Sequence, residues 1–292
     1  MQFQPLTCHE SLRPFIRNYW LLSARCTAPG AQRIYSNGAA SLHFYLTQNV
    51  RLDDSAERFC TALNHHDLGY MVIHSEEGIF NILGVEFVPF CARLFFPTLS
   101  GEVAHFSPTP SGDQAFIELS TKIHASQDTT EQVALLDDFF CQRLNEIPID
   151  ERNMERLSSV FNEIVPTEGE PVAIKDFETL SPSDLASTAC LGQKQFTRVF
   201  NKYVGMAPKS YLRLLRFNKA MLELQKAAGK QTLAEIAWQC GYSDSAHMTN
   251  DFHQLCGHSP SEILEFGTRM TEAFSSSYSS QMKKKVLLEN VE

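Results

Sequence analysis

The sequence lacks three features that would place it in a membrane or outside the cell. It has no uninterrupted apolar run of about 18 residues, the length that a membrane-spanning helix requires, so we expect no contact with a membrane. Its first residues contain no basic segment followed by an apolar core, so we expect no secretory signal peptide. Its eight cysteines include no CxxC pair and are expected to be reduced thiols. Together these absences predict a cytoplasmic protein.

The sequence also lacks the short motifs of common enzymes. It contains no GxSxG, no glycine-rich phosphate-binding loop and no HExxH. Scattered serine, histidine and aspartate residues do not exclude a catalytic triad, but no spacing points to one. We therefore predict that the chain is not an enzyme and has no cofactor.

A zinc site is the other chemistry that the residue types suggest. Cysteine and histidine residues recur near the end of the chain, but their spacing matches no common zinc finger. Core and surface roles account for these residues, which are Cys240, His247, His253 and Cys256. The first 150 residues contain no His-x-His followed by a suitably spaced glutamate. We therefore expect no metal in either part of the chain.

Two long stretches of the chain each lack charges of one sign: one has no acidic residue and the other has no Lys or Arg. The whole chain has a net charge of −9, and its first 150 residues hold 9 Lys/Arg against 17 Asp/Glu. Residues 193–222, in contrast, carry seven Lys/Arg and no acid. Residues 232–267 show the reverse, with five acids and no Lys or Arg. A surface that faces phosphate needs a local positive excess, and residues 193–222 supply one.

The spacing of apolar residues separates a β-rich part from a helical part. Residues 1–125 contain short aromatic and β-branched segments, which predict an antiparallel β-barrel or sandwich. The clearest of these segments are residues 41–46, 70–74 and 79–89. From 131 to 165 apolar residues recur at intervals of three and four, which predicts two helices separated by Pro148. The fold class is therefore expected to be α+β.

A short segment rich in proline, glycine and acids, residues 166–172, is typical of a linker between domains. We place a first domain at residues 1–165 and a second, all-α domain at residues 173–267. Residues 268–292 are rich in serine and lysine, and this composition predicts a disordered tail.

One motif occurs twice in the last third of the chain. Phe200, Gly205 and Pro208 are five and three residues apart, and the same three residue types recur 52 positions later. Each copy predicts a short helix, a turn and a second helix that ends at a glycine. This is the pattern of a helix-turn-helix, whose second helix enters the major groove of DNA.

The first helix-turn-helix has a strongly basic second helix. We expect Ser183 to cap the first helix and Leu191-Gly192 to form the turn. The second helix, from 193 to about 204, buries its aromatic residues and leaves the opposite face to read bases. We expect Arg198 to be the main base contact. The predicted base-reading residues of this helix are Lys194, Thr197, Arg198 and Asn201.

A long helix from 208 to about 226 is predicted to connect the two copies. At 1.5 Å per residue it is about 28 Å long, close to the ~34 Å of one DNA turn. Basic residues near and along it are better placed for phosphates than for bases. The predicted phosphate contacts are Lys202, Lys209, Arg213 and Arg216.

The second helix-turn-helix is acidic, and we expect it to contribute less affinity for DNA. Asn250 can pair with adenine but cannot neutralise phosphate, and the adjacent Asp251 is expected to repel the DNA backbone. The predicted base-reading residues here are Ser245, Ala246, His247, Thr249 and Asn250.

These motifs resemble the DNA-binding module of the AraC/XylS family of bacterial transcription regulators. The resemblance covers about residues 174–266 and is carried by the segments 184–186, 196–200 and 235–244, together with the two Phe, Gly and Pro sets. It implies binding to double-stranded promoter DNA, usually with activation of transcription and contact with RNA polymerase. This chain departs from the family pattern in the second recognition helix, where family members commonly have an arginine and this chain has Asn250.

The first domain resembles an uncharacterised sensor domain that is often paired with this module, in the segments 12–20, 33–38 and 84–89. The resemblance implies a cupin-like β-barrel that binds a small effector or forms a homodimer. The residues proposed to line an effector pocket are Tyr35, His43, Tyr45 and Glu86. The helical stretch 133–164 is the candidate dimer surface, to be tested by charge substitution at Leu136 and Phe140, although such helices more commonly pack onto their own barrel.

Two other functions stay open at this stage. One is an enzyme built on the β-rich domain, against which the missing catalytic motifs argue. The other is a small-molecule-binding or interaction protein whose DNA-binding module has decayed, which the acidic second helix-turn-helix favours.

Overall fold

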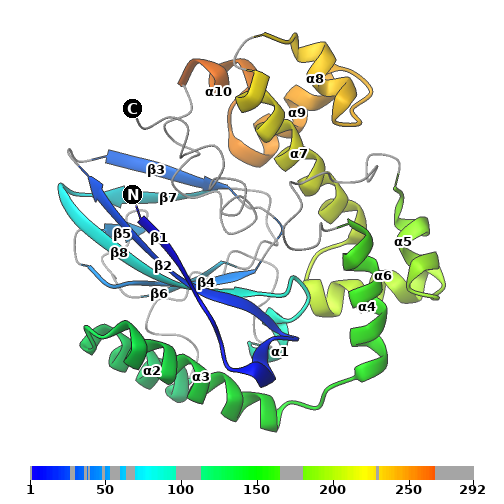
Figure 1. The fold of residues 1–292 in the computed structure, drawn as a ribbon. Coiled ribbons are helices and arrows are strands. Elements are labelled where there is room, and N and C mark those ends of the chain that lie inside the picture. Colours follow the sequence, from blue (N-terminus) through cyan, green and yellow to red (C-terminus); the bar gives the residue numbers. More distant parts are fainter. Residues whose placement is uncertain are drawn as a thin grey trace.

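A computed structural model describes residues 2–26, 30–35, 38, 40–47, 50–52, 60–63, 70–96, 113–164, 180–227 and 230–266. Within these ranges two antiparallel sheets are followed by helices (Figure 1). This confirms the α+β class, with open sheets in the first part and a helical second part. The linker 166–172 and the tail 268–292 lie outside the described residues, and the division into two domains stays a prediction. No helix among the described residues is long and apolar enough to span a membrane.

The strands form a larger and a smaller sheet. The five-stranded sheet has the order β1 (Gln2–Leu6), β2 (Ile16–Cys26), β8 (Gly78–Phe87), β4 (Ser41–Tyr45) and β6 (Cys60–Leu63). The three-stranded sheet has the order β3 (Gly30–Tyr35), β7 (Tyr70–Ser75) and β5 (Val50–Leu52). The predicted segments 41–46, 70–74 and 79–89 correspond to β4, β7 and β8, so these strands are confirmed.

The helices of the first part precede those of the helix-turn-helix region. The first set is η1 (Glu10–Leu12), α1 (Ala92–Phe95), α2 (Gln114–Ala125), α3 (Thr129–Glu146) and α4 (Glu151–Ile164). The second set is α5 (Pro182–Thr188), α6 (Gln193–Val204), α7 (Pro208–Ala227), α8 (Leu233–Gln239), α9 (Ser245–Cys256) and α10 (Pro260–Phe266). The two helices predicted on either side of Pro148 are α3 and α4.

Helix α2 lies in the region expected to be β-rich, and that expectation is wrong for residues 114–125. The Asp113 carboxylate caps the helix by accepting a hydrogen bond from the Phe116 backbone N–H at 3.1 Å. Phe116, Leu119 and Ile123 then recur at intervals of three and four on its buried face. The cap residue and this spacing are the sequence signals for a helix. The segment is short and follows aromatic strands, which is why the β-rich prediction extends over it.

One face of the five-stranded sheet packs on α2 and α3, which lie beneath it in Figure 1. Strand residues such as Phe44 and Val85 share this core with Leu136 and Phe140 of α3. Both α3 side chains are 0% exposed. The candidate dimer surface at these two residues is therefore wrong, and the alternative, packing onto their own sheet, is what the structure shows. A homodimer stays a proposal without an assigned surface.

The other face of this sheet carries Trp20, Gly84 and His43 side by side on β2, β8 and β4. Gly84 leaves room for the Trp20 indole, since a Cβ atom at residue 84 would lie 2.0 Å from its Cε2 atom. The indole in turn contacts the His43 ring, with 5.1 Å between ring centroids. Burial lowers the pKa of the His43 imidazole from 6.5 to about 4, so this ring is neutral near pH 7.

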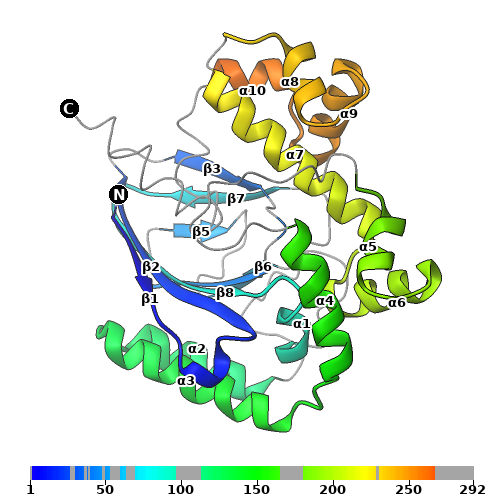
Figure 2. The ribbon, with the colours of Figure 1, turned by 45° about the vertical axis from the view of Figure 1, so that its right-hand side comes forward.

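Helix α4 joins the two parts of the structure. It lies beside α5 and α6 in both views (Figures 1 and 2). Phe161 of α4 stacks on Phe200 of α6 with 5.8 Å between centroids, and also contacts Phe90, which follows β8. Although the sequence groups α4 with the first domain, its apolar face belongs to the core of the helix-turn-helix region.

Replacing Gly84 with alanine should destabilise the protein by about 1–3 kcal/mol, because the added methyl group overpacks the Trp20 site. Urea unfolding of the Gly84→Ala variant measures this loss. In the Trp20→Leu background the same substitution should cost clearly less, since the clashing ring is gone. An equal cost in both backgrounds would contradict the steric explanation.

His43 should make stability depend on pH between about 6.5 and 4. As the pH falls through this window, the unfolded chain binds a proton at residue 43 that the folded chain does not. Stability is therefore retained above pH 6.5 and falls by about 1.4 kcal/mol per pH unit below it. Urea unfolding at pH 7 and pH 5 should show a smaller acid loss for His43→Gln than for the wild type. Equal losses would show that His43 is not held neutral.

Candidate nucleic-acid interface

The first helix of the first helix-turn-helix, α5, begins with a capping box. Ser181 is the cap, and its side chain accepts a hydrogen bond from the Asp184 N–H at 3.4 Å. The Asp184 carboxylate accepts hydrogen bonds from the Ser181 hydroxyl at 2.6 Å and from the Ser181 N–H at 2.8 Å, and these two bonds lower its pKa. The expectation that Ser183 caps the helix is wrong, because Pro182 occupies the first helical turn and the cap precedes it.

The turn between α5 and α6 contains Cys190, whose φ of +50° is left-handed. The chain then enters α6 at Gly192, and the predicted bounds 193–204 are confirmed. Phe196, Val199 and Phe200 are buried on one side of this helix and hold it against α5 and α7. Gly205 ends the helix with a φ of +86°, a conformation that glycine adopts without strain.

The outer side of α6 is an exposed basic stripe. Lys194, Arg198 and Lys202 are spaced four residues apart and exposed, and Asn201 lies beside them. Thr197 is half-buried and its hydroxyl donates to the Gln193 carbonyl at 2.9 Å. Three of the four predicted base-reading residues therefore share an exposed face.

The four predicted phosphate contacts, one on α6 and three on α7, lie in different environments. Lys202, at the end of α6, and Lys209 are exposed. Arg216 is half-buried, and its guanidinium lies 5.5 Å from the centroid of the Tyr242 ring. Arg213 is bound to Asp251 of α9. The structure thus leaves two of the four cations open to the solvent and turns two toward the second helix-turn-helix.

Three acids of the second helix-turn-helix cap helices. Glu235 forms a capping box with Thr232 at the start of α8, and Asp244 accepts from the His247 N–H at 2.7 Å at the start of α9. Glu262 accepts from the Ser259 N–H at 2.6 Å before α10. These hydrogen bonds hold the pKa of each carboxyl below its usual range. The acids neutralise helix N-termini, which carry partial positive charge.

The fourth acid, Asp251, is 4% exposed and faces α7. The expectation that it stands beside the DNA backbone is wrong, because its carboxylate is buried against Arg213. The outer face of α9 presents Ala246, His247 and Asn250, and none of these is a lysine, arginine or acid. Ser245 and Thr249 are half-buried, and the Thr249 hydroxyl donates to the Ser245 carbonyl at 2.8 Å.

The residues proposed for an effector pocket lie in the first part of the chain. His43, Tyr45 and Glu86 lie on the same face of the five-stranded sheet, the face that also carries Trp20. All three are buried, and Glu86 lies 3.8 Å from an Arg17 nitrogen. Tyr35 belongs to β3, and its side chain lies outside the described residues. Sequence reasoning missed Trp20 and Asn18, which share this face.

The cysteine and histidine residues of the second helix-turn-helix have separate environments. Cys240 is buried in the turn, which raises its thiol pKa to about 11. The Cys256 thiol donates to the Phe252 carbonyl at 3.1 Å, and His253 is exposed. In the part of the chain that the structure describes, no three His, Cys, Asp or Glu side chains gather as metal ligands would.

Comparisons with known proteins agree with this geometry. A family model described as "Helix-turn-helix domain" matches residues 185–265. The regulator ArgR of Pseudomonas aeruginosa is 27% identical over 85 residues, which are 29% of this chain and 25% of that protein. The activator RhaS of Escherichia fergusonii is 31% identical over 88 residues, which are 30% and 31% of the two chains. The chain thus spans less than a third of either relative.

Among solved structures, ToxT from Vibrio cholerae aligns over 86% of this chain and 99% of its own, with 13% identity and a TM-score of 0.42. The expectation that the chain is not an enzyme agrees with the relatives, which are named as transcriptional regulators. With its capped helices, its two glycine-ended second helices and the family match, the region from residue 185 to 265 belongs to the AraC-type helix-turn-helix domains.

Proposed function

We propose that this protein is a sequence-specific DNA-binding transcription regulator that places α6 and α9 in adjacent major grooves of promoter DNA. The observation that carries the proposal is the exposed stripe of Lys194, Arg198 and Lys202 on α6, in a segment without acids. Cations on an inserted helix bind phosphates and guanine edges. RhaS is named as a transcriptional activator, which supports activation as the outcome, and we propose that it proceeds through contact with RNA polymerase.

The two reading helices make unequal contributions in this proposal. Helix α6 offers the cations that anchor the complex, whereas the exposed residues of α9 include no lysine or arginine. An arginine can bond guanine through two atoms, and an asparagine can do the same with adenine. The expected binding site therefore contains guanine where Arg198 lies and an A·T pair where Asn250 lies.

We further propose that a neutral small molecule binds between the two sheets and acts as an effector. The Trp20 Nε1, His43 Nε2 and Asn18 Oδ1 atoms are buried on one face of the sheet, and none has a hydrogen-bond partner among the described residues. Buried polar atoms are nearly always hydrogen-bonded, so these three suit a ligand with its own donors and acceptors. A neutral ligand fits because the pKa of His43 is about 4.

A buried contact supports transmission from this face to the DNA-binding region. The Tyr211 hydroxyl at the start of α7 donates to the Gly38 carbonyl at 3.1 Å, three residues before β4 begins. Tyr211 also packs on Phe161 and Phe200. Movement of β4 is therefore expected to reach the connecting helix directly.

The proposed function predicts that purified protein enriches one sequence motif from a random pool of DNA duplexes. Arg198→Ala should then weaken binding to the enriched duplex by about 1–3 kcal/mol, and Asn250→Ala by less. Gel shifts at fixed salt measure both losses. Lys122→Ala, which removes an exposed cation from α2, is the matched control and should bind like the wild type.

A larger loss for Asn250→Ala than for Arg198→Ala would contradict the unequal contributions. Binding without any enriched motif would contradict the proposal of a sequence-specific regulator. It would favour an interaction protein whose DNA-binding module has decayed.

The effector proposal predicts a change at Trp20, one of two tryptophans in the chain. Trp238 is 79% exposed, so the Trp238→Phe variant leaves the buried Trp20 as the single reporter. Titration with a panel of neutral carbonyl and hydroxyl compounds should include one that shifts its fluorescence with saturation. The shift should weaken in the variant that also carries His43→Gln. A panel that leaves Trp20 unchanged at millimolar concentration would count against a neutral ligand at this face.

A further inference from the structure

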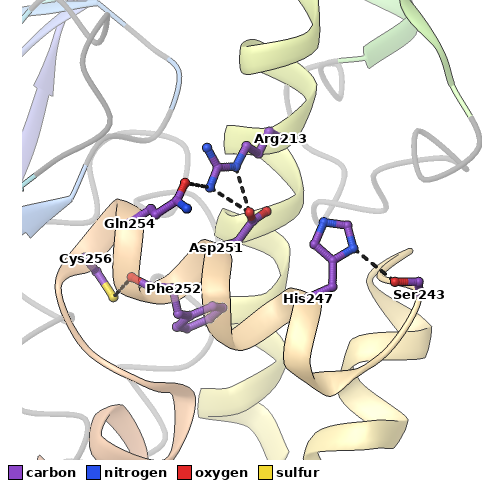
Figure 3. A network of polar contacts seen from close by, with 7 residues as sticks. All are labelled: Arg213, Ser243, His247, Asp251, Phe252, Gln254 and Cys256. Carbon is purple, nitrogen blue, oxygen red and sulfur yellow. Dashed lines mark hydrogen bonds and ion pairs between the residues drawn. The ribbon is translucent and has the colours of Figure 1, made fainter.

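An ion pair ties the second reading helix to the connecting helix. The Arg213 guanidinium on α7 donates through Nε to the Asp251 Oδ1 atom at 2.7 Å, and its Nη2 atom lies 2.7 Å from the same oxygen. Nη2 also donates to the Gln254 side-chain oxygen, one helical turn further along α9 (Figure 3). One arginine therefore binds two residues of α9 that are one helical turn apart.

Burial makes this pair costly to separate. The Asp251 side chain is 6% exposed and that of Arg213 is 25% exposed. The second carboxylate oxygen of Asp251 is buried with no hydrogen-bond partner among the described residues, so Arg213 supplies the main compensation for the charge. Removing one member of such a pair leaves an uncompensated buried charge.

The ion pair adds directional bonds to the apolar packing between the two helices. Phe217 of α7 and Phe252 of α9 meet edge to face with 4.8 Å between centroids. Met248, Leu255 and Cys256 of α9 are buried in the same core, which selects the inner face of the helix. The bonds to Asp251 and Gln254 add direction to this packing, because they depend on angle and flank Phe252 in the sequence. Asn250, which directly precedes Asp251, is thereby directed to the outer face.

The same geometry argues against Arg213 as a phosphate contact. To reach a phosphate, the guanidinium would have to release Asp251 and leave that carboxylate buried without a counter-charge. Lys209, one turn earlier on α7, is exposed, so it can contact a phosphate without leaving a buried carboxylate unpaired.

We propose that Arg213, Asp251 and Gln254 form a clamp that positions α9 for base reading, in place of the phosphate contacts that this helix lacks. The proposal rests on the proposed function, because it concerns how the second reading helix meets DNA. Arg213 and Asp251 are positioning residues in it, and Asn250 makes the contact.

The test uses the full chain and the duplex enriched from the random pool, labelled for footprinting. Arg213→Gln and Asp251→Asn should have the same effect, which is loss of protection over the half read by α9 with protection over the α6 half retained. Affinity should fall on the order of tenfold in each, and the double variant should lose no more than either alone. The dependence of affinity on salt should stay that of the wild type, because no phosphate contact is removed.

Lys209→Gln is the matched control on the same helix. It should keep the whole footprint and lower the salt slope by about one, as expected for loss of one phosphate contact. The clamp is overturned if Arg213→Gln behaves like Lys209→Gln while Asp251→Asn keeps or improves binding.

Circular dichroism checks that each variant is folded. If either charge variant unfolds, Gln254→Ala replaces it, because residue 254 is exposed and the change removes one hydrogen bond. Partial loss of protection over the α9 half supports the clamp, and an unchanged footprint contradicts it. Failure of the wild type to enrich any motif would instead contradict the proposed function, so the two failures are distinguishable.

Discussion

The arrangement of the reading helices depends on the stack of Phe161 on Phe200. Phe161 comes from α4 and Phe200 from the middle of α6, and Tyr211 at the start of α7 closes the cluster against both rings. Aromatic rings in such contact add stabilisation beyond the burial of their area. Because Tyr211 also donates to the Gly38 carbonyl, the same cluster fixes the helix-turn-helix region relative to the sheets. The outward direction of the Arg198 face follows from this packing.

Residue type alone did not reveal what the acids of the second helix-turn-helix do. Summed over residues 232–267 they suggest a surface that repels DNA. In the structure Glu235 and Asp244 bind backbone N–H groups at helix starts, and Asp251 lies inside against Arg213. A charge count treats each carboxylate as free in solvent. In the structure, backbone N–H groups at helix starts and a buried arginine compensate these charges locally. The weaker role of α9 now rests on its missing cations.

Much of the fold could be predicted because local signals agree with the tertiary structure. The bounds of α6 follow from the Gly192 turn and Gly205, and the strands β4, β7 and β8 follow from aromatic and β-branched runs. Contacts between distant segments could not be predicted, because no local pattern encodes them. The Arg213–Asp251 pair spans 38 positions, and the row of Trp20, Gly84 and His43 depends on sheet register. In the proposed clamp, the direction of Asn250 likewise depends on this distant pair.

The position of α4 bears on how such chains can be recombined in evolution. Phe161 belongs to the core of the reading helices, although it precedes the Pro- and Gly-rich segment at which the composition changes. A gene fusion that joined a foreign sensor at residue 173 would leave Phe200 and Tyr211 without the ring that covers them. An exchange that keeps these three rings together therefore has to include α4, one helix before the boundary that composition marks.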